Sequence, residues 1–116
     1  MSDSIEGFNQ FRRTMNDKIF AAGNLTTNRF FNLDTRVYEP GALDGKTKEL
    51  LGLVASLVLR CDDCITYHVL RCCEEGVTDP EIQEAFSIGL VVGGSIVIPH
   101  LRRAVARLEE TRLPPP

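Results

Sequence analysis

The sequence predicts an all-α protein, and three features of its patterning lead to this fold class. Apolar residues recur at helical spacing through most of the 116 residues. Alternating runs of β-branched residues, which are typical of strands, are absent apart from a short stretch at residues 96–98. Capping residues and glycines also divide the chain into segments of helical length.

The length and composition limit the class of protein. A chain of 116 residues with 43% hydrophobic residues predicts a single domain, residues 1–116. Its net charge of -3 argues against nucleic acid as a partner, because phosphates attract basic surfaces. No uncharged apolar stretch reaches the roughly 18 residues of a membrane span, and the first residues lack a signal-peptide pattern. We therefore expect a cytoplasmic protein with no membrane partner.

The first part of the chain, about 1–40, is predicted to be a helical extension. A helix is expected over residues 4–22, closed by Gly23 and Asn24. The pattern over residues 26–38 is weaker, and the chain breaks at Glu39-Pro40-Gly41. One face of the first helix carries an apolar stripe, which indicates core or interface: Phe8, Phe11, Met15, Ile19 and Phe20.

The next helix is expected to begin after Asp44, which can serve as its N-cap, and to end near Leu59. Beyond Glu49 it is apolar almost all round. A helix without a polar face lies deep in a core or under another subunit, and so small a domain has little depth. This pattern predicts a homo-oligomer.

Three further segments complete the prediction. One helix should start at Cys61 or Asp62 and run to about Glu75, ended by Gly76. A second has the strongest start signal in the chain, with Thr78 and Glu81 forming a capping box, and continues to Gly93-Gly94. A last helix is expected over residues 99–110, followed by a flexible proline-rich tail at 112–116.

The motif that could carry chemistry is Cys61-x-x-Cys64 followed by His68. On a helix these side chains lie within roughly 60° of one another, so they share one face. The start of a helix and a nearby imidazole both favour the thiolate, which is the reactive form of cysteine. The spacing also lets the two sulfurs form a disulfide. The pair can therefore cycle between dithiol and disulfide.

Other readings of these residues remain open at this point. The cysteines could be small core residues, or Cys61, Cys64, His68 and Cys72 could bind zinc from one helix face, although zinc ligands usually come from two separated elements. Cys72 is more simply explained as a core residue, and His100 as a structural or surface histidine. By itself Glu49 resembles an ordinary solvated helix residue.

The sequence resembles the carboxymuconolactone decarboxylase family, specifically its alkylhydroperoxidase D-like branch, over roughly residues 40–110. That branch has a glutamate twelve residues before the first cysteine and a histidine four residues after the second, and Glu49, Cys61, Cys64 and His68 match these spacings. The resemblance implies an alkylhydroperoxidase D-like helical bundle built on an antiparallel helical hairpin. It also implies a homo-trimer or homo-hexamer.

The resemblance further implies that Cys64 attacks a hydroperoxide and that Cys61 resolves the product as a disulfide. Glu49 and His68 would relay the proton, a dithiol reductant would restore the thiols, and no cofactor or metal would be needed. In some members of the branch a second histidine precedes the second cysteine, where this chain has Asp63. An acidic neighbour raises thiol pKa values, so this departure weighs against efficient peroxidase activity.

The alternatives to a thiol peroxidase are of different classes. The other activity of the resembled family, lactone decarboxylation, needs no cysteine pair. A redox-sensing oligomer without catalytic activity could use the same disulfide to change shape, and a zinc-binding structural domain would hold its cysteines on a metal. Steady turnover of peroxide distinguishes an enzyme from a sensor, and metal analysis tests the zinc alternative.

Overall fold

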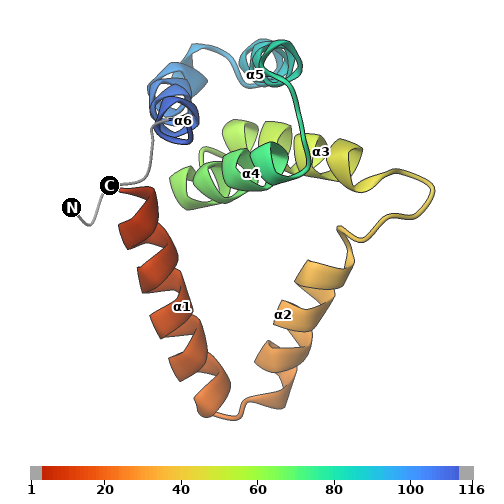
Figure 1. Ribbon diagram of the computed structural model, residues 1–116, viewed down its shortest axis with the longest axis vertical. Helices are drawn as coiled ribbons and strands as arrows, with labels where there is room; N and C mark the ends of the chain where they lie inside the picture. The colour runs from red at the N-terminus through yellow and green to blue at the C-terminus, as the bar shows by residue number, and fades with distance from the viewer. Residues whose placement is uncertain (1–3, 113–116) are drawn as a thin grey trace. The chain divides into compact units, whose positions relative to one another are not determined.

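The computed structural model describes residues 4–112, and within them every regular element is a helix, as predicted. The elements in chain order are α1 (Ile5–Ala21), α2 (Leu25–Arg36), α3 (Gly45–Leu59), α4 (Asp62–Glu74), α5 (Asp79–Gly93), the 3-10 turn η1 (Ser95–Val97) and α6 (Ile98–Glu110) (Figure 1). No helix among these residues is long and apolar enough to cross a membrane. The predicted flexible tail lies outside the described residues from position 113 onward.

The chain separates into two compact units, Met1–Glu39 and Pro40–Pro116, and each is described by itself. That all 116 residues form one domain stays a prediction. The second unit contains the cysteine motif and the residues of the resemblance.

The first unit contains α1 and α2, which are joined by a turn at Gly23 (Figure 1). The hydroxyl of Ser4 caps α1 by accepting the N–H of Gly7 at 3.0 Å, so this helix begins where the sequence predicts. Asn24 caps α2 by accepting the N–H of Thr27 at 3.1 Å. Asn24 therefore starts the second helix as well as following the first.

The apolar stripe of α1 is mostly exposed. Phe8 is buried, whereas Phe11, Met15 and Phe20 are exposed. Phe20 contacts Phe31 of α2 edge to face, with 5.1 Å between the ring centroids. Within the first unit, therefore, most of this stripe is not buried in a core.

The second unit is built around α3, which packs against α4 on one side and α5 on another, while α6 packs against α4 (Figure 1). The buried core draws on all of these helices and on η1. It consists of Leu53, Leu57, Ile65, Val69, Cys72, Ile82, Ala85, Phe86, Val97, Ala104 and Leu108. Burial of Cys72 agrees with its prediction as a core residue.

Local signals explain the ends of α5. The Thr78 N–H donates to Glu81 Oε1 at 2.8 Å, and the Glu81 N–H donates to Thr78 Oγ1 at 3.4 Å, which completes the predicted capping box. At the other end Gly94 adopts a φ of 82° and stops the helix. The β-branched stretch at residues 96–98 forms η1 and the start of α6 instead of a strand.

Candidate active site

The turn between α3 and α4 positions the two cysteines of the motif. Arg60 adopts a left-handed conformation, with φ 59° and ψ 41°, and reverses the chain at the end of α3. The N–H of Cys61 then donates to the carbonyl oxygen of Ser56 at 3.1 Å. Cys61 is therefore held against the last turn of α3 while it starts α4.

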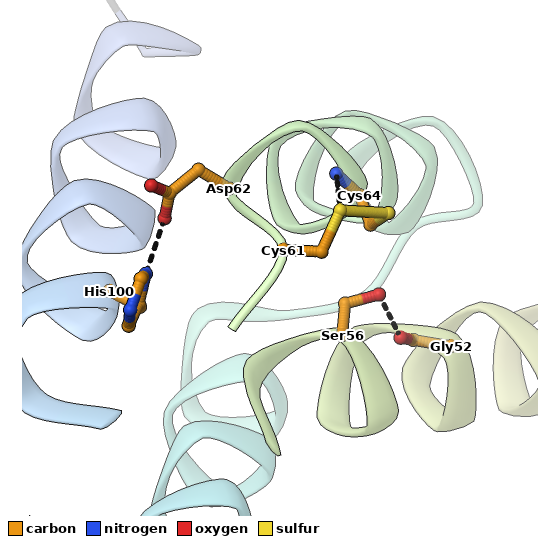
Figure 2. The surroundings of a disulfide bond; sticks show 6 residues. All are labelled: Gly52, Ser56, Cys61, Asp62, Cys64 and His100. Carbon is orange, nitrogen blue, oxygen red and sulfur yellow. Dashed lines mark hydrogen bonds and ion pairs between the residues drawn. A yellow bond between two sulfur atoms is a disulfide. The ribbon is translucent and has the colours of Figure 1, made fainter. Parts of the chain in front are cut away.

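Cys61 and Cys64 form a disulfide in the first turn of α4, with 5.2 Å between their Cα atoms (Figure 2). Cys61 is the N-cap of the helix, and its Sγ accepts the N–H of Cys64 at 3.3 Å. Cys64 is exposed and Cys61 is half-buried. The predicted meeting of the two sulfurs is present, and Cys64 is the more accessible of them.

Glu49 and His68 meet between α3 and α4. The Glu49 side chain is 1% exposed and its Oε1 lies 2.8 Å from Nδ1 of the buried His68. With a carboxylate as partner, Nδ1–H is the donor, and Nε2 is then the nitrogen that accepts a proton. Glu49 is thus a buried partner of His68, which excludes the solvated alternative. His68 lies one helical turn after Cys64.

The position of the imidazole depends on Gly52, one turn after Glu49 on the same face of α3. A Cβ placed on Gly52 would lie 2.5 Å from Cε1 and 2.7 Å from Nε2 of His68. The ring therefore rests directly on the α3 backbone. Ser56, on the next turn, donates its hydroxyl to the Gly52 carbonyl oxygen at 2.7 Å (Figure 2).

The second oxygen of Glu49 faces Arg71 of α4, which the sequence analysis missed. Glu49 Oε2 lies 3.5 Å from Arg71 Nε, and Arg71 Nη1 donates to Glu74 Oε2 at 2.8 Å. Partial burial opposes the charge of Arg71, but the hydrogen bond with Glu74 and the attraction of both carboxylates raise its guanidinium pKa above the usual value. The spacing of three residues from His68 to Arg71 was the available signal.

The two remaining cysteines have different environments. Burial, followed by the negative charge of Glu49, raises the pKa of Cys72 to about 12. Its thiol therefore stays protonated and unreactive at neutral pH. Cys73 is exposed, and its Sγ lies 3.8 Å from Thr111 Oγ1. Neither of them lies beside the disulfide on the first turn of α4.

The two acidic residues of the motif also differ. Asp62 is bound by His100 and Arg103 of α6, at 2.7 Å and 3.0 Å. Asp63 is exposed. His100, expected to be a structural or surface histidine, is half-buried and touches the residue that follows the first cysteine.

A zinc site requires several ligand side chains in one place. Among residues 4–112, no group of three or more His, Cys, Asp or Glu side chains is arranged to hold a metal ion. Of the residues offered by the sequence, Cys61 and Cys64 are bonded to each other and His68 contacts Glu49.

Comparison with known sequences identifies related proteins. The sequence model of the carboxymuconolactone decarboxylase family matches residues 24–107, so the match begins before the region of the resemblance and includes α2. Uncharacterized protein 4 of the cox locus of Paracoccus denitrificans is 33% identical over 89 residues, which cover 77% of this chain and 80% of that protein.

Solved structures resemble the chain as well. A crystal structure of a Thermotoga maritima protein has a TM-score of 0.90 and 65% identity, covering 92% of this chain and 94% of that one. A second crystal structure of the same protein has a TM-score of 0.88 and 66% identity, covering 91% of this chain and 90% of that one. It names that protein a carboxymuconolactone decarboxylase family member with a suggested antioxidative role. A family member from Legionella pneumophila, 24% identical with TM-score 0.82 and coverage of 90% and 94%, shares the fold.

Proposed function

The chain belongs to the carboxymuconolactone decarboxylase family, and we propose that it is a thiol-dependent peroxidase with an antioxidant role. The observation that carries this proposal is the Cys61–Cys64 disulfide, one turn from the buried Glu49–His68 pair. The antioxidative role suggested for the similar Thermotoga maritima protein supports it.

The first step oxidises Cys64, whose exposure gives a small hydroperoxide access. His68 accepts the thiol proton at Nε2, and Glu49 stabilises the imidazolium that forms. The thiolate attacks one peroxide oxygen, the O–O bond breaks, and the alkoxide leaves and takes a proton to become an alcohol. The product on the protein is a sulfenic acid at Cys64.

The second step returns the site to the disulfide. The thiolate of Cys61 attacks the sulfenic sulfur, an S–S bond forms, and hydroxide leaves as water after taking a proton. The two thiols have then supplied the two electrons that reduce the peroxide. A dithiol reductant, a protein or a small molecule, reopens the disulfide by exchange and becomes oxidised itself.

Peroxide consumption with a dithiol reductant tests the proposal. Cys64→Ser should abolish turnover, whereas Cys61→Ser should accumulate a sulfenic acid or mixed disulfide on Cys64, seen by mass spectrometry. Cys73→Ser is the matched control, because it removes an exposed cysteine outside the motif and should leave turnover unchanged. Equal residual activity in the Cys64 and Cys61 variants contradicts the assigned roles.

The same measurement separates the alternatives. Formation of one disulfide per chain without steady turnover identifies a redox sensor. Lactone decarboxylation that survives loss of both motif cysteines identifies a lyase. Metal bound in protein purified without chelator identifies a zinc domain.

A further inference from the structure

Asp62, His100 and Arg103, here called the Asp62 cluster, connect α6 to the redox motif. Asp62 Oδ1 lies 2.7 Å from His100 Nδ1, and Asp62 Oδ2 accepts the Nη1–H of Arg103 at 3.0 Å. Figure 2 shows the carboxylate turned toward His100, on the helical turn that carries the disulfide. Both oxygens of a residue between the two cysteines are therefore held by basic residues from another helix.

Asp62 lies on the first turn of α4, between the two cysteines. A carboxylate near a cysteine disfavours the thiolate, because two negative charges repel each other. A hydrogen bond from His100 and the positive charge of Arg103 both stabilise the carboxylate and so reduce that repulsion. His100 is the better shielded of the two partners, with 19% of its side chain exposed against 63% for Arg103. The contribution of Arg103 is accordingly more strongly screened by solvent.

The cluster is not what holds α6 in place. Ala104 and Leu108 of α6 are buried in the core with Ile65 and Val69 of α4. Apolar packing of this kind supplies most of the free energy of helix association. His100 and Arg103 are not part of this core. Their contacts to Asp62 can therefore affect the cysteine motif without being needed to attach α6.

We propose that His100 and Arg103 are positioning residues of the redox motif, which hold the Asp62 carboxylate against α6, turned away from the disulfide, and stabilise its charge there. This inference assigns the cluster a part in the thiol chemistry proposed above and rests on that function. Arg60, which precedes the motif, and Asp63, which lies within it, are both exposed.

The test measures alkylation of the fully reduced protein against pH, resolved by peptide so that Cys73 does not contribute. His100→Gln should raise the pH of half-maximal alkylation of the motif cysteines by about half a pH unit, and Arg103→Gln by less, because each variant releases the Asp62 carboxylate and leaves its charge less stabilised. Asp62→Asn should lower it. Arg102→Gln, which removes the same charge from the neighbouring exposed position, should leave it unchanged.

The double variant Asp62→Asn with His100→Gln separates charge compensation from simple damage to the fold. If the effect of His100 passes through Asp62, His100→Gln should cause no further rise in the Asp62→Asn background. An equal rise in both backgrounds, or an equal effect of Arg102→Gln and Arg103→Gln, overturns the proposal. Alkylation needs no peroxide turnover, so the result stands apart from the success of the proposed function.

Discussion

Glu49 is a buried acidic residue whose two carboxylate oxygens are both engaged, Oε1 by His68 and Oε2 by Arg71. An ionised carboxylate away from water needs such partners, because the desolvation penalty of an unpaired one is several kcal/mol. Both partners lie on α4, one turn apart, while Glu49 lies on α3. The same contacts that stabilise the buried charge therefore fix the orientation of the imidazole.

Loss of the carboxylate should weaken the proton acceptor. Glu49→Gln or His68→Ala should raise the pH at which Cys64 is alkylated in the reduced protein, by about one unit, because a thiolate loses the support of a nearby cation or base. Peptide-resolved alkylation measures this. Glu84→Gln, on the exposed surface of α5, is the matched control. An unchanged profile for Glu49→Gln and His68→Ala removes both from the relay.

Gly52 should tolerate no side chain while His68 is in place. Because the Cβ of Gly52→Ala would lie 2.5 Å from His68 Cε1, the ring or the α3 backbone must shift. We expect a loss of about 1–3 kcal/mol in the free energy of unfolding, the usual effect of overpacking. The double variant with His68→Ala should recover most of this loss in a denaturant titration. Equal losses in both backgrounds argue against contact with the ring.

The site was only partly predictable from its residues. The cysteine spacing and His68 follow from the geometry of one helix, and Glu49 was recognised from the family pattern. Gly52 could not be identified, because the register between α3 and α4 decides which residue faces the imidazole. The partners of Asp62 lie on α6, 38 and 41 residues farther along the chain, and no local rule brings them together.

At the scale of elements, a contact between helix starts joins α3 to α5. Lys46 Nζ lies 2.8 Å from Glu81 Oε2, while the other oxygen of Glu81 belongs to the capping box of Thr78. The hydrogen bond from Lys46, followed by those from Thr78, lowers the pKa of Glu81 to about 2 from its ordinary 4.5. The Glu81 carboxylate thus caps the start of α5 and also binds the first turn of α3.

This contact should give stability a dependence on acid pH. Because the folded-state pKa of Glu81 is depressed, its contribution is complete above pH 4.5 and is lost as pH falls through about 2. The difference in unfolding free energy between the wild type and Glu81→Gln should be constant near neutrality and shrink between these values. Denaturant titrations at several pH values measure it. A difference that is independent of pH contradicts the ionic contribution.

Helix starts with a clear N-cap signal were predicted correctly, whereas the start of α2 and the stretch at residues 96–98 were predicted less well. Asp44 and Thr78 cap α3 and α5 as expected, because a side-chain acceptor before an apolar run is a local signal. Asn24 was missed as the cap of α2, since it directly follows Gly23 and was assigned to the preceding turn. The residues at 96–98 have β-branched side chains, but Gly94 and packing of Val97 in the core place them in a helical turn.

At the scale of the whole molecule, much apolar surface is uncovered in the described chain. The large exposed hydrophobic residues include Leu51, Leu59, Ile88, Val91, Val92 and Ile96 in the second unit. Where such residues gather into one patch, they mark an association surface. The homo-trimer or homo-hexamer expected from the resemblance would cover such a surface, and it remains a proposal.

The mass in solution should be a multiple of 12.9 kDa. Val91, at 85% exposure, is the most exposed large apolar residue among positions 4–112. Val91→Lys should therefore shift the protein toward smaller species in light scattering if α5 forms an interface. Gln83→Lys, an exposed polar position on the same helix, should leave the mass unchanged. A wild-type monomer contradicts the oligomer.

The N-cap of α4 links the oxidation state of Cys61 to the backbone of the first helical turn. Cys61 Sγ receives the Cys64 amide while it is bonded to the Cys64 sulfur. A free thiolate carries a full negative charge and is a stronger acceptor than a disulfide sulfur. Reduction of the disulfide should therefore remove a covalent restraint on the first turn of α4 and strengthen the hydrogen bond from the Cys64 N–H to a Cys61 thiolate. The response to reduction would thus begin at the sulfur that gains the electrons, in the first turn of α4.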